Sequence, residues 1–73
     1  MVDTERLRKK IADSGIKYKN IAASLGINPY TLQLKIDGVN EFVTSEVSGL
    51  CDILAITDLR EKEDIFFTKK VDY

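Results

Sequence analysis

The stretch from Lys19 to Gly38 reads KNIAASLGINPYTLQLKIDG and carries two apolar helical patterns with a break between them. Gly26 ends the first pattern, because glycine readily adopts the left-handed backbone that follows many helices. Asn28 is a favoured N-cap residue, and Pro29 suits the first helical position, where a backbone donor is not needed. The stretch therefore predicts two helices that meet at a steep angle through a short, rigid turn.

The remainder of the chain also has helical periodicity. Helices are expected over residues 4–14, from residue 17 or 18 to residue 25, over 29–36, from about residue 44 onward and from about residue 58 onward. The fourth segment has apolar residues three and four positions apart, which is the spacing of a buried stripe. This stripe consists of Val47, Leu50, Cys51 and Leu54. The predicted fold class is all-α, a compact five-helix domain over residues 1–68 with a short flexible tail over 69–73.

The composition excludes several classes of protein. With 73 residues, the chain suits one small domain and leaves little room for an enclosed active site. It contains no histidine and one cysteine, Cys51, so neither a disulfide nor a Cys/His zinc site is expected. No nucleophile–base pair or phosphate-binding glycine loop is visible, so we expect no enzyme, metal, cofactor or small-molecule ligand. The lack of a long apolar run and of a signal peptide predicts a cytoplasmic protein without a membrane partner.

Charge is unevenly distributed along the chain. Residues 1–36 contain seven basic and three acidic residues, a net charge of +4. Residues 37–73 contain four basic and nine acidic residues, a net charge of −5. A nucleic-acid-binding protein needs a basic surface, and the basic half coincides with the two helices around the turn. The alternative is a chance segregation of charges on solvated helix faces.

Several segments follow the sequence pattern of one DNA-binding family. Six residues occupy positions of that family's helix-turn-helix core, namely Ile21, Ala22, Leu25, Gly26, Ile27 and Leu32. Further along, the chain reads KIDGVNEF, TSEV and EDIFF. In these features it resembles the lambda-repressor and Cro family, and in particular small Cro-like regulators of Gram-positive phages and mobile elements. It departs from the family at Tyr18, where many relatives have glutamine, and at Lys17, where threonine or serine is common. The resemblance implies a lambda-repressor-like DNA-binding domain with a helix-turn-helix.

The helix period of about 100° per residue separates two faces on the segment 29–36. Leu32 and Ile36 fall on the inner face, whereas Tyr30, Gln33 and Leu34 fall on the outer side. Glutamine can pair with the N6 and N7 edge of adenine, and leucine can contact a thymine methyl group. Base contacts are therefore expected from Asn28, Tyr30, Gln33 and Leu34. Phosphate contacts are expected from Lys17, Tyr18, Lys19, Thr31, Lys35 and Asn40.

These features predict a sequence-specific, double-stranded DNA-binding transcriptional regulator of Cro or repressor type. A domain this small covers little DNA, so a homodimer on a palindromic operator is expected. The C-terminal half could supply the dimer contact or pack over the core, through Leu59, Ile65, Phe66 and Phe67. The basic cluster of Arg6, Arg8, Lys9 and Lys10 is either a solvated helix face or a further DNA contact. The alternative function is a small helical protein-binding module, such as an antirepressor or adaptor that uses this fold without DNA.

Overall fold

The computed structural model describes residues 1–68, which form five helices and no strand. The helices are α1 (Thr4–Ser14), α2 (Tyr18–Leu25), α3 (Pro29–Ile36), α4 (Thr44–Ile53) and α5 (Leu59–Phe66). The all-α prediction is confirmed, and the predicted bounds of the first and third helices agree with those observed. The flexible tail expected over residues 69–73 lies outside the described residues.

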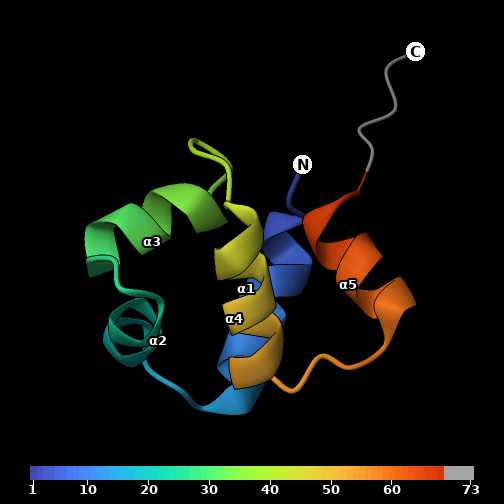
Figure 1. Ribbon diagram of the computed structural model, residues 1–73, viewed down its shortest axis with the longest axis horizontal. Helices are drawn as coiled ribbons and strands as arrows, with labels where there is room; N and C mark the ends of the chain where they lie inside the picture. Colours follow the sequence, from blue (N-terminus) through green and yellow to red (C-terminus); the bar gives the residue numbers. More distant parts are fainter. Residues whose placement is uncertain (69–73) are drawn as a thin grey trace.

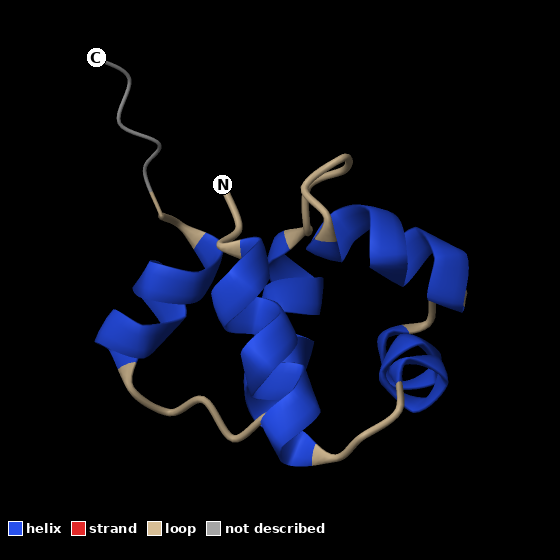
Figure 2. Ribbon diagram, turned by 180° about the vertical axis from the view of Figure 1, so that it is seen from behind, coloured by secondary structure: helices blue, strands red, loops and turns tan. Residues whose placement is uncertain are grey.

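The helices surround one apolar core. In Figure 1, α2 and α3 lie at one end of the molecule and α5 at the other, with α1 and α4 between them. The view from behind in Figure 2 gives the same order. Helix α2 packs against α3 and α4, while α1 packs against α3 and α5. Every helix contributes to the core, and the side chains without any solvent exposure include Leu7, Ile21, Leu32, Ile36 and Leu50.

The turn between α2 and α3 has the conformation that its residues favour. Gly26 has a φ of 73°, in the left-handed region where glycine meets no steric penalty. The side chain of Asn28 accepts a hydrogen bond from the amide of Thr31 at 2.7 Å, and Pro29 begins α3. Figure 1 views α2 nearly along its axis but α3 from the side, so the two helix axes are steeply inclined. The steep, short turn predicted from the sequence is therefore present.

Small residues allow α2 to pack closely with its neighbours. Ala22 is completely buried in the core. On α4, a Cβ atom at Gly49 would lie 2.7 Å from Cδ2 of Leu25, which is closer than unbonded carbon atoms approach. The C-terminal end of α2 thus packs against α4 as well as against α3. These contacts fix the position of the turn from which α3 begins.

The C-terminus of α4 has a geometry that favours glycine, although the chain has alanine there. The amide of Ile56 donates to the carbonyl of Cys51 at 2.8 Å, and the amide of Ala55 donates to the carbonyl of Asp52 at 3.4 Å. These are the two hydrogen bonds of a Schellman motif. Ala55 consequently has a φ of 56°, which within residues 1–68 is the one positive φ outside glycine. The left-handed conformation makes this residue a point of backbone strain.

Ala55→Gly is expected to raise the free energy of unfolding by about 0.5–1 kcal/mol. The left-handed conformation costs an L-residue about 1–2 kcal/mol, and the larger entropy of glycine in the unfolded chain offsets part of the gain. Urea denaturation followed by circular dichroism measures the change. The control is Ala23→Gly at an exposed position of α2. This substitution should lower the free energy of unfolding by about 0.5–1 kcal/mol. If Ala55→Gly destabilises the protein as much as the control, the turn is not strained.

At the start of α5, Asp58 is followed three residues later by Glu61, which is the spacing of a capping box, but the structure uses only the first of these two residues as a cap. Asp58 caps the helix by accepting from the amide of Arg60 at 3.1 Å. Glu61, three residues later, does not complete a capping box, because its carboxylate pairs instead with Lys10 of α1 at 3.0 Å. This interhelical ion pair fastens α5 to α1.

The apolar residues of α5 divide between the core and the surface. Ile65 and Phe66 are buried, and the ring of Phe66 meets that of Phe42 edge to face at a centroid distance of 5.8 Å. Leu59 and Phe67 are exposed by 67% and 57%. The sequence left open whether these residues pack over the core or form a dimer contact, and the structure gives a different answer for each pair. Ile65 and Phe66 cover the core, whereas Leu59 and Phe67 stay accessible to a second molecule.

Candidate nucleic-acid interface

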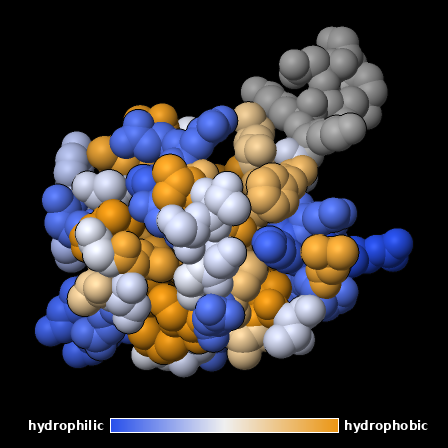
Figure 3. Space-filling view, in the orientation of Figure 1, coloured by the Kyte–Doolittle hydropathy of each residue, from blue (hydrophilic) through white to orange (hydrophobic). Residues whose placement is uncertain are grey.

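Helix α3 has one buried and one accessible side. Leu32 and Ile36 are completely buried, whereas Tyr30 is 71% exposed. Gln33 and Leu34 are partly exposed on the shoulders of the helix. The division between the two faces agrees with the prediction from helix periodicity. The space-filling view in Figure 3 shows hydrophobic and hydrophilic side chains side by side over α3 and the loop after it. This surface is therefore not purely polar.

The N-terminus of α3 brings two of the predicted base-contacting residues together. Asn28 and Tyr30 are both exposed and lie on either side of Pro29. The oxygen of the Asn28 carboxamide accepts a hydrogen bond from the amide of Thr31, so the amino group of this carboxamide is the part that can donate to a further partner. Thr31 itself is partly buried. The outer side of α3 thus presents amide donors and acceptors, a phenol and an aliphatic side chain, which are the groups that contact base edges in a major groove.

The N-terminus of α2 lies at the other side of the turn and differs from those of α1, α3 and α5. Lys17 occupies the N-cap position, and no side chain caps the helix. Asp3, Asn28 and Asp58 do cap the other three helices. Uncapped amides at a helix N-terminus favour an anion. Tyr18, next in the chain, is partly buried against the core.

Two cations flank these amides. Lys17 and Lys19 are exposed, and within residues 1–68 neither lies within ion-pair distance of a carboxylate. Asn40, in the loop after α3, is exposed too. Lys17, Lys19 and Asn40 therefore remain accessible for the phosphate contacts expected of them.

Lys35 is placed differently from the other residues expected at phosphates. Its side chain is only 12% exposed, and its ammonium group donates to Oε1 of Glu46, whose side chain is 9% exposed. The same carboxylate oxygen accepts from the amide of Val43 at 2.9 Å, at the start of α4. Lys35 is thus turned inward and joins α3 to α4, and its ammonium group already has an acidic partner, unlike those of Lys17 and Lys19.

The Glu46 carboxylate remains ionised because of these partners. Burial by itself would raise the pKa of Glu46. The hydrogen bonds from Lys35 and from the Val43 amide, together with the positive charge of Lys35, outweigh burial and hold the pKa below its ordinary value of 4.5. Val43 has no side-chain acceptor, so Glu46 provides half of a capping box in addition to the ion pair.

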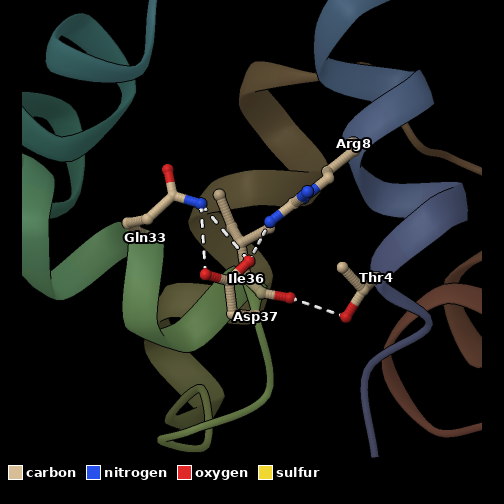
Figure 4. A network of polar contacts seen from close by, with 5 residues as sticks. All are labelled: Thr4, Arg8, Gln33, Ile36 and Asp37. Carbon is tan, nitrogen blue, oxygen red and sulfur yellow. Dashed lines mark hydrogen bonds and ion pairs between the residues drawn. The ribbon is translucent and has the colours of Figure 1, made fainter.

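The C-terminus of α3 is tied to α1 by a polar network, which Figure 4 shows from close by. Asp37 accepts a charge-assisted hydrogen bond from the guanidinium group of Arg8. Both oxygens of the Asp37 carboxylate also lie 3.3 Å from Nε2 of Gln33, one turn earlier on α3. Beside this network, the hydroxyl of Thr4 donates to the carbonyl of Ile36 at 2.9 Å. The orientation of α3 is therefore fixed from the α1 side as well.

The basic cluster of α1 is partnered within the monomer. Arg6 pairs with Asp3 at 3.3 Å, Lys9 with Asp13 at 3.5 Å and Lys10 with Glu61 at 3.0 Å. With Arg8 held by Asp37, all four basic residues have an acidic partner. The observed pairing favours a solvated and structural role for this cluster over a DNA contact.

Sequence reasoning did not find the partners of Lys35 and Gln33. Glu46 and Asp37 lie eleven and four positions after the side chains that they contact. The second spacing is one helical turn and could have indicated an i,i+4 contact, because such residues face each other on a helix. Glu46, by contrast, looks in the sequence like an ordinary charge in the first turn of α4.

Comparison with known proteins adds no identification. No protein-family model, curated protein or solved structure matches the chain. Among residues 1–68, no cluster of potential metal ligands occurs, and no helix has both the length and the apolarity needed to cross a bilayer. Any function must therefore be inferred from the geometry of the site itself.

Proposed function

We propose that the protein is a sequence-specific DNA-binding regulator that places α3 in the major groove of a duplex. The observation that carries the proposal is the outer side of α3, where Tyr30 is exposed and Gln33 and Leu34 are partly exposed. On the inner side of the same helix, Leu32 and Ile36 are completely buried. Polar and apolar groups of this kind contact base edges and thymine methyl groups. The lambda-repressor and Cro family, which the sequence resembles around the turn, binds DNA through such a helix.

The N-terminus of α2 supports the proposal, because it supplies the sequence-independent part of the contact. Lys17 and Lys19 would contact phosphates, together with the uncapped amides between them. Tyr18 would add one hydrogen bond from its hydroxyl group. Asn40, in the loop after α3, would contact the DNA backbone on the opposite side of that helix. These groups fix the position of the protein on the duplex, and α3 then distinguishes sequences.

Dimerisation is a second part of the proposal. A single domain of this size covers few base pairs, and two copies on a palindromic operator would cover enough for tight and selective binding. Leu59 begins α5 and Phe67 follows its last residue, and both are exposed apolar residues. Helix α5 lies at the end of the molecule opposite α2 and α3 in Figure 1, although Phe67 itself lies beside the loop that follows α3. A contact between two copies at this end would leave both α3 helices free to bind DNA.

The alternative function is that of a protein-binding module. The observation that favours it is the exposure of apolar side chains on different sides of the molecule, at Tyr30, Leu59 and Phe67. The overall net charge of −1 is also low for a DNA-binding protein. Such a module would use the same surface without any affinity for nucleic acid.

Salt dependence separates the two functions. Binding of the full chain to a random-sequence duplex, followed by fluorescence anisotropy, should weaken steeply with salt, because phosphate contacts release counterions. Lys19→Ala should weaken binding to specific and random duplexes alike and lower the magnitude of the salt slope by about 1 for each bound protomer. Lys62→Ala on α5 removes the same charge far from α3 and should leave the slope unchanged. The absence of any binding at low salt would favour the protein-binding module.

A further inference from the structure

Resting on the proposed DNA-binding function, we propose that Asp37 determines base specificity by fixing the orientation of the Gln33 carboxamide. In this orientation Gln33 presents its oxygen outward and selects adenine over guanine. Asp37 would not touch the base itself. It acts through Gln33 and is therefore a positioning residue.

The chemistry of the contact fixes the orientation of the carboxamide. A carboxylate only accepts hydrogen bonds, so the group of Gln33 that faces it must be the amino group and not the oxygen. Nε2 of Gln33 lies 3.3 Å from each oxygen of Asp37, which is a shared contact with both. In Figure 4, the carboxamide oxygen of Gln33 points away from Asp37. Turning the carboxamide by 180° would place oxygen against carboxylate, which is repulsive.

Asp37 is itself held in place from the other side. Arg8 of α1 donates to one oxygen of the carboxylate, and the side chains of Arg8 and Asp37 are 48% and 35% exposed. The adjacent hydrogen bond from Thr4 to the carbonyl of Ile36 at 2.9 Å anchors the backbone next to Asp37. The orientation of Gln33 is thus set by two helices rather than by a free rotation on one.

An outward oxygen has consequences for base choice. Adenine presents a donor at N6 and an acceptor at N7, so the Gln33 oxygen can accept from N6. The amino group has two hydrogen atoms, and while one is directed at Asp37 the other can reach N7. Guanine presents acceptors at both O6 and N7, so it would face the oxygen of Gln33 unless the carboxamide turned over. Turning over would break the contact with Asp37.

Asp37 also places a negative charge close to the DNA, whose phosphates repel it. Arg8 offsets this charge, which removes Arg8 from the cations available to phosphates. Asp37 therefore lowers the affinity for DNA in general, because it neutralises Arg8, and it also sharpens the choice at one base pair. Both consequences can be measured in the same experiment.

The test compares Asp37→Asn with Asp13→Asn. Asparagine can offer Gln33 either an oxygen or an amino group, so both orientations of the Gln33 carboxamide become satisfied. Asp13 pairs with Lys9 on α1, so Asp13→Asn removes the same charge without touching Gln33. The full-length wild type and both variants are used to select sites from a random pool of duplex DNA. The position read by Gln33 is the one whose preference disappears in Gln33→Ala.

At that position the wild type and Asp13→Asn should prefer adenine to guanine by about 5- to 150-fold, the range of one good bidentate contact. Asp37→Asn should reduce this ratio to about twofold, keep the rest of the site, and bind random DNA more tightly. An unchanged adenine preference in Asp37→Asn would overturn the proposal, as would a wild-type preference for guanine. If the wild type selects no site, the DNA-binding function fails first and this proposal fails with it.

A measurement without DNA checks the contact directly. The side-chain amino protons of Gln33 should shift in the NMR spectrum of Asp37→Asn and keep their positions in Asp13→Asn. Unshifted resonances would show that Gln33 and Asp37 do not interact, which would also overturn the proposal. Because Asp37 and Arg8 are partly exposed, Asp37→Asn should remain folded.

Discussion

Glu46→Ala is expected to lower the free energy of unfolding by about 3 kcal/mol. The substitution leaves the ammonium group of Lys35, whose side chain is only 12% exposed, without its partner. It also leaves the amide of Val43 without its acceptor. Removing one member of a buried ion pair destabilises strongly because the remaining charge is uncompensated. A domain of this size has a total stability of about 4–10 kcal/mol, so much of it would be lost. Guanidinium denaturation measures the difference.

Glu41→Ala is the matched control, because Glu41 is exposed in the loop before α4 and has no ion-pair partner within the described residues. It should change the free energy of unfolding by less than about 0.5 kcal/mol. An equally small effect of Glu46→Ala would contradict the structural role of the ion pair between α3 and α4.

The stabilisation by Glu46 should also depend on pH. The folded state lowers the pKa of this carboxylate from its ordinary value of 4.5, so the unfolded chain binds the proton more readily. The contribution is therefore complete above the ordinary pKa and is lost as the pH falls through the lower pKa of the folded state. The difference in stability between wild type and Glu46→Ala should accordingly shrink below about pH 4.5.

Gln33→Ala is expected to weaken binding to the preferred duplex by about 1–3 kcal/mol and to relax the preference at one base position. Truncation removes both hydrogen bonds that the carboxamide could make to a base edge. Binding to random DNA should change little, because such binding depends on phosphate contacts at α2. Anisotropy titrations with the selected duplex and with a scrambled duplex of the same length measure the two affinities.

Asp52→Ala, at an exposed position on α4, serves as the control for Gln33→Ala and should leave both affinities unchanged. An equal loss on the selected and the scrambled duplex would mean that Gln33 contacts the backbone rather than a base. In that event the specificity would have to come from Asn28, Tyr30 or Leu34.

Sequence reasoning succeeded where structure depends on neighbouring residues. Helix ends follow from residues such as Gly26, Asn28 and Pro29, whose backbone preferences act within a few positions. The inner and outer sides of α3 follow from the helix period, so the burial of Leu32 and the exposure of Tyr30 could be predicted.

Sequence reasoning failed where the partner of a side chain lies on another helix or loop. Lys35 looked like a surface cation in the sequence, yet Glu46 on α4 draws it inward. The same limit applies to Arg8 of α1, whose partner Asp37 follows α3. A charged residue on a helix shoulder has a long side chain that can turn toward solvent or toward a neighbouring helix. Only the packing of the helices decides between these directions.

The proposal that α3 contacts the DNA duplex can be tested by mapping which residues of the protein are affected when DNA binds. In a two-dimensional ¹⁵N–¹H NMR titration of the full chain with the selected duplex, the largest shifts should occur at Asn28, Tyr30 and Gln33 and around Lys19. Leu59 and Phe67 should shift less if they change only through dimerisation. Shifts centred on α5, with the amides from Asn28 to Gln33 unmoved, would contradict the placement of α3 against DNA.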